Sequence, residues 1–332
     1  MPITLKDVAE MAGVSRSAVS RTFTEGASVS KKTRAKVESA AAALGYQPNA
    51  LASSLTTGRT KLIGLVADNF HNPFFLEVFD LFTRGLQDRG LRPLLVNLTA
   101  ETEAEHSVRL LRQYSVDGVV VASSTLAPGF AVAFQKAGLP VVHSFGRLSG
   151  TPGVHVIGID NAECGRIAAR ALIARGYRRI AFLGGPETAT STQDRFTGFV
   201  EEAARHTEIT ISQSFARAYS FDAGRVEMTK LLMTDPAEAY FCGDDVIAIG
   251  ALSAAQSAGL NVPRDIGLLG LNDMEMARWE NINLTTIHQP VGQIIERSVA
   301  HVVRLLDAPE TPAEAQLFPC HLVERGTLRP LP

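Results

Sequence analysis

The chain has 332 residues, of which 45% are hydrophobic and 20% are charged, and its formal net charge is −2. This length predicts two or three domains, and this composition excludes a disordered or fibrous protein. No apolar run reaches the roughly 18–20 residues that a membrane span needs, and the N-terminus lacks the apolar core of a secretory signal, so we expect neither a membrane protein nor an exported one.

The three cysteines predict no special chemistry. Cys164, Cys242 and Cys320 lie far apart and outside any CxxC motif. That spacing favours neither a disulfide framework nor a zinc site, so we expect small core side chains in a reducing cytoplasm. We expect no metal ion and no cofactor.

Charge is distributed unevenly along the chain. Residues 1–60 carry a net charge of +4, which leaves −6 for the remaining residues. A cationic head on an acidic body is typical of a polyanion-binding module joined to a separate domain. Lysines that are simply solvated can produce the same asymmetry. Charge alone therefore does not distinguish a polyanion-binding module from an ordinary solvated surface.

Residues 4–23 have the pattern of two short helices joined by a tight turn. Thr4 and Asp7 have the spacing of a capping box, Gly13 suits the left-handed residue that ends a helix, and Ser15 can cap the next one. The expected inward side chains are Leu5, Val8, Ala9, Ala12, Ala18, Val19 and Phe23. The second helix then presents a polar outer face made of Arg16, Ser17, Ser20 and Arg21.

A third helix is expected after Ser30, running to Gly45, with Val37, Ala41 and Leu44 completing a small core. Two helices joined by a short glycine-containing turn, the second with a polar outer face, form a helix-turn-helix. We therefore expect residues 1–47 to form a three-helix DNA-binding domain.

The same residues carry a family resemblance. The head resembles that of the lactose-repressor (LacI/GalR) family of bacterial transcription regulators, and the similarity extends over essentially the whole chain. The matching stretches of the head are Thr4–Ala9, Ala12–Ser15, Val19–Arg21, Val29–Ser30, Thr33–Val37 and Leu44–Asn49. The resemblance implies a regulator, most simply a repressor, that binds double-stranded operator DNA as a homodimer.

The resemblance also implies which head residues contact DNA. The second helix would enter the major groove, where Arg16, Ser17 and Arg21 are expected to contact base edges. Phosphate contacts are expected from Ser15, Ser20, Thr33 and Arg34, and Thr4 and Ser30 complete the expected DNA-binding set. Ala18 departs from the polar residue common in relatives, so base recognition there would be apolar. The alternative is that Arg16 and Arg21 contact only phosphate.

Residues 48–58 have the pattern of a short helix followed by a linker. About two turns of helix are not stable alone in water, so this segment should fold only against a partner. The resemblance implies that the partner is the same segment of a second subunit, over the DNA minor groove. Asn49 would then begin the helix, Ala52 would permit close approach and Leu55 would act as a wedge between base pairs. The alternative is a simple linker.

From about residue 60, short apolar runs alternate with helical stretches. The clearest runs are 62–66, 93–96, 118–121, 140–142, 180–183, 239–242 and 266–269. This alternation predicts an α/β core of doubly wound parallel sheets in two lobes. The resemblance implies a core like that of periplasmic sugar-binding proteins, spanning 59–332, with the chain crossing between lobes near Asp160, Gln289 and Phe318. The N-lobe would take about 60–160 and 290–318, and the C-lobe about 161–288 and 319–332.

Ligands of such folds bind at the carboxyl ends of the strands, here in the cleft between the lobes. Carried over position by position, the resemblance implies an effector site that contains Asp68, Phe74, Phe145, Asp160, Arg195, Tyr219, Asp244, Asn272 and Gln289. Aromatic side chains would cover the apolar face of a ring, and polar ones would pair with its hydroxyls. The alternative for Phe74 and Tyr219 is a purely structural role in the core.

Two positions depart from the family pattern. Asp244 stands where Asn is usual, and Asn272 stands where Asp is usual. The expected effector is therefore a sugar, a sugar acid or a nucleoside-like molecule, with no single sugar implied. The chain ends with the stretch Gly326–Pro332, and no leucine heptads follow it. This favours a dimer over a coiled-coil tetramer.

Catalytic motifs are missing from the sequence. It contains no GxGxxG, GxxxxGK[ST], HExxH or GxSxG motif, so we expect no catalytic residues and no enzyme. Two other functions are alternatives to a ligand-controlled regulator. A solute-binding transport component would lack the cationic head, and a constitutive DNA-binding protein would have a cleft without a ligand.

Overall fold

The computed structural model describes residues 3–24, 26–47, 54, 58–98, 104–148 and 153–332. The chain divides into two compact units, Met1–Lys61 and Leu62–Pro332, and each is described by itself. No helix in the described part of the chain is both long enough and apolar enough to cross a membrane.

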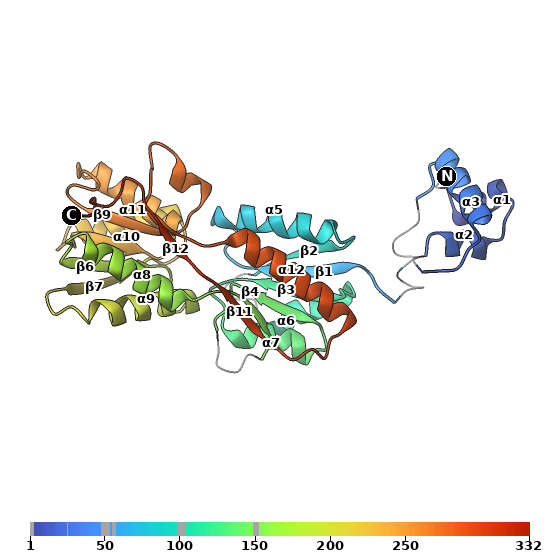
Figure 1. The fold of residues 1–332 in the computed structure, drawn as a ribbon, viewed down its shortest axis with the longest axis horizontal. Helices are drawn as coiled ribbons and strands as arrows, with labels where there is room; N and C mark the ends of the chain where they lie inside the picture. Colours follow the sequence, from blue (N-terminus) through green and yellow to red (C-terminus); the bar gives the residue numbers. More distant parts are fainter. Residues whose placement is uncertain (1–2, 25, 48–53, 55–57, 99–103, 149–152) are drawn as a thin grey trace. The chain divides into compact units, whose positions relative to one another are not determined.

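The first unit is called the head, and its described residues form the helices α1 (Leu5–Ala12), α2 (Arg16–Thr22) and α3 (Lys31–Leu44) (Figure 1). The Asp7 carboxylate accepts hydrogen bonds from the Thr4 backbone N–H at 2.7 Å and from its hydroxyl at 2.8 Å, which begins α1. Gly13 ends α1 in the left-handed conformation, with φ 64°. The small core consists of the buried residues Val8, Ala9, Ala12, Val19, Val37, Ala40 and Ala41.

The second unit, called the core, contains two six-stranded sheets that define two lobes (Figure 1). The N-lobe sheet has the order β11-β5-β4-β3-β1-β2, and all its strands are parallel. Its strands are β1 (Leu62–Ala67), β2 (Arg92–Asn97), β3 (Gly118–Ala122), β4 (Val141–Ser144), β5 (His155–Ile159) and β11 (Ala315–Phe318).

Helices cover both faces of the N-lobe sheet. They are α5 (Phe74–Gln87), α6 (Ala104–Gln113), α7 (Pro128–Lys136) and α12 (Val291–Asp307). Successive side chains of a strand point to opposite faces. Ile63 and Leu65 therefore pack with residues of α5 and α12, whereas Val66 packs with Leu111 and Phe134 on the other face. The nearly continuous apolar runs of the sequence follow from this double burial.

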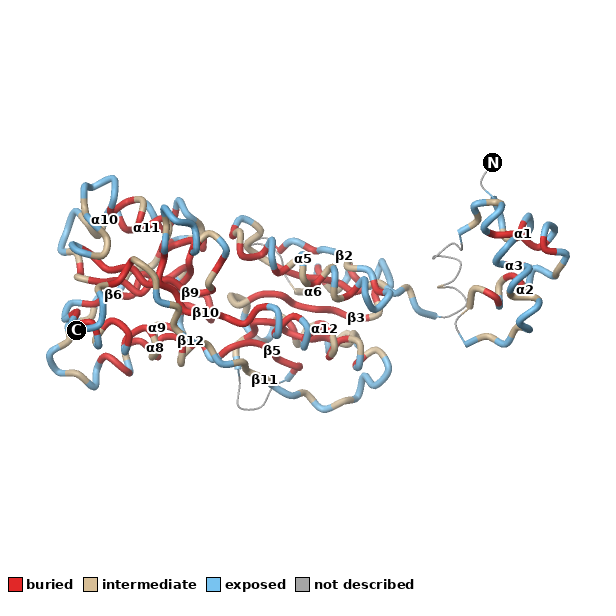
Figure 2. Tube along the Cα trace, turned by 45° about the horizontal axis from the view of Figure 1, so that its top comes forward, coloured by how far each residue is buried: buried red, intermediate tan, exposed pale blue. Residues whose placement is uncertain are grey.

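The C-lobe sheet has the order β12-β10-β9-β8-β6-β7. Its strands are β6 (Arg179–Gly184), β7 (Thr210–Phe215), β8 (Ala239–Cys242), β9 (Gly267–Asn272), β10 (Thr286–His288) and β12 (His321–Val323). Its helices are α8 (Asn161–Ala174), α9 (Thr190–Ala203), α10 (Phe221–Leu232) and α11 (Asp245–Ser257), with the short 3-10 turn η1 (Glu275–Arg278) after β9. The inner strands of both lobes are buried, as the red tube in Figure 2 shows.

The predicted fold class, a three-helix head with two doubly wound sheets, is confirmed. One strand differs from the expectation of parallel sheets, because β12 runs antiparallel to β10 at the edge of the C-lobe. Only two residues separate β11 from β12, so the chain enters the C-lobe sheet directly from the carboxyl end of β11. A β12 parallel to β10 would need a longer connection that first carries the chain to the opposite end of the C-lobe sheet.

Three segments of chain connect the lobes. The chain passes from β5 to α8 at Asp160, from β10 to α12 at Gln289 and Pro290, and from β11 to β12 at Pro319 and Cys320. Each lobe is therefore built from separate pieces of sequence. The carboxyl ends of the N-lobe strands and of the C-lobe strands both adjoin these connections.

Candidate functional site

The second helix of the head presents an exposed polar face. The Ser15 hydroxyl accepts from the Ala18 backbone N–H at 3.2 Å and so caps α2. Arg16, Ser17 and Arg21 are exposed, whereas Val19 is buried against the other helices. The face can therefore contact a flat or grooved surface without disturbing the core of the head.

The beginning of α3 holds the expected phosphate-binding residues. Ser30 caps this helix by accepting from the Thr33 N–H at 3.1 Å, and its hydroxyl donates to the Thr33 hydroxyl at 2.9 Å. Arg34 is half-buried, and its Nη1 donates to the Thr22 carbonyl at 2.8 Å. Arg34 therefore ties α3 to the end of α2, and a phosphate contact would have to coexist with this bond.

The hinge predictions fall mostly outside the described residues. Asn49, Ala52 and Leu55 are not among them, and of the neighbouring residues the structure describes Ser54 and Gly58. The Gly58 backbone N–H donates to the Ser54 carbonyl at 2.9 Å, a spacing of four residues.

A pocket lies between the lobes at the carboxyl ends of the strands. Its free volume is only about 20 Å³, so a ligand larger than water needs the lining to move apart. Both lobes contribute to its lining, which consists of Asn69, Asn72, Phe74, Phe75, Ser124, Thr125, Phe145, Arg195, Tyr219, Asp244, Asn272 and Gln289. Seven of the nine expected effector-site residues are in this lining, and Asp68 and Asp160 are not.

Asp244 occupies the centre of the polar part of the pocket. It caps α11, with Oδ1 accepting from the Val246 N–H at 2.8 Å. Its other oxygen, Oδ2, accepts from the Asn272 amide at 2.9 Å and from the Asn72 amide at 3.0 Å. Burial raises the pKa of this carboxyl to about 6. Asn72 belongs to the N-lobe, so this single oxygen joins the two lobes.

Arg195 supplies the positive charge of the pocket. It comes from α9 and is buried, and its Nε donates to the Asn161 side chain at 2.8 Å. Its Nη1 donates to the Gly243 carbonyl at 2.5 Å, beside Asp244. These two bonds fix the plane of the guanidinium, so its remaining donors point in a defined direction.

Aromatic rings form the apolar wall of the pocket. Phe74 meets Phe145 edge to face with ring centroids 5.8 Å apart, and it meets Phe75 in the same way at 5.6 Å. On the C-lobe side, the Tyr219 hydroxyl is hydrogen-bonded to Ser191 at 3.1 Å and to Thr192 at 2.7 Å. The wall thus combines ring edges from one lobe with an oriented phenol from the other.

Two lining residues have an unusual backbone. Phe145 has φ 65° and Asn272 has φ 124°, a region that L-residues rarely adopt. The Asn272 side chain is fixed further because its Oδ1 accepts from the Gln289 amide at 3.3 Å. Such backbone strain concentrates at binding sites, where neighbouring contacts hold the residue in place.

Asp68 lies next to the lining and does not belong to it. Its Oδ2 accepts from the hydroxyl of Thr125, which does line the pocket. Its Oδ1 is buried and has no partner among the described residues. This oxygen is an acceptor that a ligand hydroxyl or a water molecule could satisfy.

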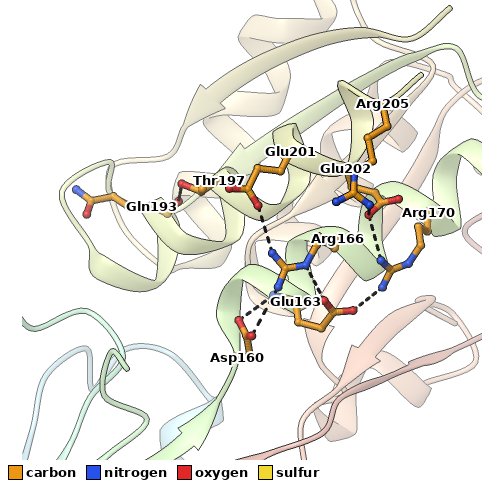
Figure 3. Close-up of polar contacts among 9 residues, drawn as sticks. All are labelled: Asp160, Glu163, Arg166, Arg170, Gln193, Thr197, Glu201, Glu202 and Arg205. Carbon is orange, nitrogen blue, oxygen red and sulfur yellow. Dashed lines mark hydrogen bonds and ion pairs between the residues drawn. The ribbon is translucent and has the colours of Figure 1, made fainter. Parts of the chain in front are cut away.

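Asp160 is not among the lining residues of the pocket, and its side chain is engaged at the start of α8. It caps α8 by accepting from the Glu163 N–H at 2.9 Å, and it lies 3.6 Å from Arg166. Figure 3 shows it at one end of an ion-pair network between α8 and α9. A carboxylate at the first turn of a helix satisfies free backbone donors, and this explains its orientation.

Five lining residues were not predicted: Asn69, Asn72, Phe75, Ser124 and Thr125. Asn72 and Phe75 belong to the motif Asn72-Pro73-Phe74-Phe75, from which only Phe74 was expected to line the pocket. The pair Ser124–Thr125 follows one residue after β3, so its position just past the end of a buried strand was the signal that could have identified it.

A second set of contacts joins the lobes at the rim of the pocket. Arg147 of the N-lobe forms a bidentate pair with Asp194 of α9, with distances of 2.6 and 2.9 Å. Nearby, the Ser191 N–H donates to the Ser124 carbonyl at 3.1 Å, and the Thr190 hydroxyl donates to the same oxygen at 3.0 Å. The lobes are therefore held together on both sides of the pocket.

The neighbouring carboxyl, Asp245, has a structural environment. It is fully buried, and burial raises its pKa to about 7. Its oxygens accept from the Thr286 hydroxyl at 2.5 Å and from the Met274 N–H at 2.8 Å. It thus fastens α11 to β10 and to the loop after β9.

Comparisons with known proteins agree with both units. Residues 4–49 match the model of the lacI family of bacterial regulatory proteins, and residues 169–328 match that of a periplasmic binding protein-like domain. The chain is 33% identical to the HTH-type transcriptional repressor PurR of Proteus mirabilis, over 98% of this chain and 96% of that protein. It is 30% identical to the repressor CytR of Escherichia coli K12, over 99% and 97% respectively.

Solved structures resemble the whole chain as well. The lac repressor dimer bound to operator and the anti-inducer ONPF has a TM-score of 0.87 at 28% identity, covering 98% of this chain and 99% of that one. The complex of the transcriptional regulator CelR with cellobiose has a TM-score of 0.73 at 28% identity, with the same coverage of both chains.

Proposed function

The chain belongs to the lacI family of bacterial regulatory proteins, and we propose how its head and core divide the work of a ligand-controlled repressor. It is a DNA-binding transcriptional regulator and not an enzyme. The head binds operator DNA, and the pocket between the lobes binds the small molecule that controls the head. The observation that carries this division is a small polar and aromatic pocket formed by both lobes, in the same chain as a head with an exposed polar recognition helix.

Operator recognition is assigned to the exposed face of α2. Arg16, Ser17 and Arg21 are free of the head's core and contact base edges in the major groove. Ser15, Ser20, Ser30 and Thr33, together with Thr4, contact phosphates and fix the register. The Arg34 guanidinium keeps its bond to the Thr22 carbonyl and uses its outer N–H groups for phosphate.

The core makes the protein a dimer with two heads on a nearly palindromic operator. The lac repressor, which this chain resembles along its whole length, is a dimer on its operator. Residues 49–55 of both subunits fold together over the minor groove, with Ala52 at the close approach and Leu55 as the wedge. Their order depends on the partner and on the duplex.

The effector proposed for the pocket is a neutral hydroxylated ring, either a sugar or the ribose of a nucleoside. The Phe74 and Phe145 rings suit an apolar ring face, while Arg195, Asn272 and Asp244 suit hydroxyl groups. The unpartnered oxygen of Asp68 accepts one more hydroxyl. CelR, a structural relative, binds the sugar cellobiose. A sugar acid would bring a third carboxyl group beside those of Asp68 and Asp244, so we rank it below the neutral ligands.

Ligand binding acts through the contacts between the lobes. Asp244 is shared by an amide of each lobe, so a ligand hydroxyl that donates to it competes with Asn72. The competition changes the angle between the lobes, and that angle favours or disfavours the paired hinge segments. Effector and operator then affect each other's affinity reciprocally, typically by about 1–3 kcal/mol.

The proposal is tested with the purified full chain. A panel of sugars, sugar acids and nucleosides is screened for thermal stabilisation, and each ligand that binds is then added to a titration of DNA selected by the protein from a random palindromic library. A ligand that stabilises the core must change DNA affinity. If every ligand that binds leaves DNA affinity unchanged, the protein is a constitutive DNA-binding protein and the regulatory proposal is wrong.

A further inference from the structure

Three metal-ligating side chains meet in the N-lobe, apart from the pocket between the lobes. They are His155 at the start of β5, His301 in α12 and Glu314 just before β11. One ring nitrogen of each histidine and one carboxylate oxygen of Glu314 lie within 4.8 Å of one another. The two imidazole rings have centroids 5.6 Å apart.

The backbone places these residues together. The strands β5 and β11 are parallel neighbours in which Ala315 pairs with Val156, and the Val156 N–H donates to the Glu314 carbonyl at 3.0 Å. Glu314 and His155 are therefore adjacent in register, and both side chains emerge on the same face of the sheet. The helix α12 covers this face, and His301 is its inward residue there, with 2% of its surface exposed.

His301 directs one ring nitrogen at the Glu314 carboxylate. Its Nδ1 lies 3.1 Å from the Arg297 carbonyl oxygen, so Nδ1 carries a hydrogen. Its Nε2 lies 2.6 Å from Glu314 Oε1. A neutral imidazole carries one hydrogen only, so Nε2 then directs a lone pair at a carboxylate oxygen. A metal ion bound to both atoms requires a separation of about 3.4 Å, so the exposed Glu314 carboxylate has to move outward when the ion binds.

His155 offers the second nitrogen. The residue is 4% exposed, and its Nε2 lies 3.4 Å from the Thr311 carbonyl oxygen, which places the ring hydrogen on Nε2. Its Nδ1 is buried and has no hydrogen-bond partner among the described residues. A buried nitrogen with an unused lone pair is rare in a protein interior and is suited to coordinating a metal ion.

We propose that His155, His301 and Glu314 bind one divalent transition-metal ion of the zinc class. Two imidazoles and one carboxylate, with water as the fourth ligand, are a donor set that zinc adopts. With bonds of about 2.0–2.1 Å, ligand atoms on tetrahedral zinc lie roughly 3.4 Å apart. The His301–Glu314 pair at 2.6 Å therefore has to separate, and any wider pair, at most 4.8 Å, has to close, by about 1 Å each.

Water and the ion can reach the cluster. Glu314 has 50% of its side chain exposed. A surface cavity lined by His155, Pro309, Glu310 and Thr311 adjoins the buried side of the site. One side of the ligand set is therefore buried and the other faces solvent, so the ion can exchange with the solution.

Arg304 competes with the ion for Glu314. Its Nη2 lies 2.5 Å from the same oxygen, Oε1, that faces His301. The Arg304 side chain is 45% exposed, so it can turn into solvent when the ion binds. Removal of Arg304 should therefore strengthen metal binding, whereas removal of any ligand should weaken it. A purely structural hydrogen-bond network predicts no metal binding in either case.

The ion would connect three segments that lead to the three lobe connections. The strand β5 leads into Asp160, α12 follows Gln289 and Pro290, and β11 leads into Pro319 and Cys320. The ligands lie at the ends of these segments away from the connections, so metal binding would cross-link the three segments within the N-lobe. We expect thermal stabilisation of the folded chain that grows with metal concentration.

The test uses the full chain after treatment with EDTA. Zinc chloride is titrated calorimetrically at pH 7, and cobalt(II) is added separately so that its visible absorption reports the coordination geometry. We expect one site per chain, a rise in the melting temperature with zinc, and a cobalt spectrum of four- or five-fold coordination. His301→Ala and Glu314→Gln should each reduce zinc affinity at least tenfold, and Arg304→Ala should increase it.

A matched control excludes binding by other histidines. His288 and His321 of the C-lobe have ring centroids 4.9 Å apart and are an alternative zinc-binding pair. His321→Ala should leave zinc affinity unchanged. Because Glu314 is half exposed, Glu314→Gln should fold even if the buried histidine variants do not, which circular dichroism checks. The proposal is wrong if the wild-type chain binds no zinc, or if Glu314→Gln binds it as tightly as the wild type.

Discussion

Asn72 of the N-lobe donates a hydrogen bond to Oδ2 of Asp244 in the C-lobe, across 3.0 Å and 172 residues of sequence. The same oxygen accepts from Asn272 of its own lobe. One carboxylate oxygen is therefore shared by an amide of each lobe at the centre of the pocket. A ligand or a substitution that replaces either amide donor therefore changes the strength of the contact between the lobes.

Asp244→Asn should weaken effector binding more than it weakens the fold. The substituted amide keeps the size of the side chain but loses one acceptor and the charge. A hydrogen bond to a charged group contributes about 1.5–3 kcal/mol, so we expect affinity for the ligand found in the panel to fall roughly tenfold or more. Calorimetric titration measures this. Unchanged affinity would show that the ligand does not contact Asp244.

The stability of the core should fall as pH rises from 5 to 7.5. Burial raises the pKa of Asp244 to about 6 and that of Asp245 to about 7, from an ordinary value of 3.8. The folded chain therefore binds more protons than the unfolded chain in this window, and its free energy of unfolding decreases with pH. For Asp244 the decrease is on the order of 1 kcal/mol. Urea denaturation of wild type and Asp244→Asn at pH 5 and pH 7.5 measures the free energy of unfolding, and the difference between the two proteins isolates the contribution of Asp244. An equal pH dependence in both proteins would contradict the assignment.

Arg147→Ala should loosen the closed arrangement of the lobes. Arg147 and Asp194 form a bidentate pair between the lobes, and both are about 30% exposed. Their contribution is reduced by solvent to about 1 kcal/mol or less, so ligand affinity should fall a few-fold. Arg166→Ala is the matched control, because Arg166 pairs only with residues of α8, its cap and α9 (Figure 3). An equal effect of both substitutions would show that the change is not specific to lobe closure.

Arg21→Ala should reduce operator recognition selectively. An arginine that bonds two acceptors of guanine discriminates by roughly 1–3 kcal/mol, whereas a phosphate contact weakens all sequences alike. We expect affinity for the selected DNA to fall more than affinity for random DNA, measured over a range of salt concentrations. Lys36→Ala, at another exposed position of the head, is the control. Equal losses on both DNAs would place Arg21 on phosphate.

Leu55→Ala should weaken operator binding and reduce DNA bending. In the proposed arrangement, Leu55 inserts between base pairs in the minor groove, and the unstacking permits a bend of about 20–90°. Alanine is too short for this insertion. Binding and circular-permutation bending assays measure the two effects. If neither changes, residues 48–58 act as a linker only.

The sequence predicted the strands that form nearly continuous apolar runs, but it missed β5, although all its residues are buried. The run 239–242 coincides with β8, and 180–183 lies within β6. The strand β7 was missed because it lies at a sheet edge and its exposed residues include Thr210, Ser212 and Gln213. The three-residue strands β10 and β12 are too short to show a period at all.

Sites are harder to predict than strands because they join distant residues. The resemblance gave Arg195 and Asp244 by position, but no spacing indicates that Asn72 donates to Asp244. Asp160 shows the converse problem. Its position at a lobe connection suggested a pocket residue, but its side chain caps α8. The cluster of His155, His301 and Glu314 could not be expected either, because its three residues converge only through the pairing of β5 with β11.

The three connections between the lobes also decide what a single cut can do. A chain joined at one point falls into two independently diffusing pieces when that point is cleaved. Here a protease that severs the segment at Asp160 leaves those at Gln289 and Cys320 intact, so the two halves stay tethered and can close again. Triple tethering also restricts the halves to opening and twisting about a common axis.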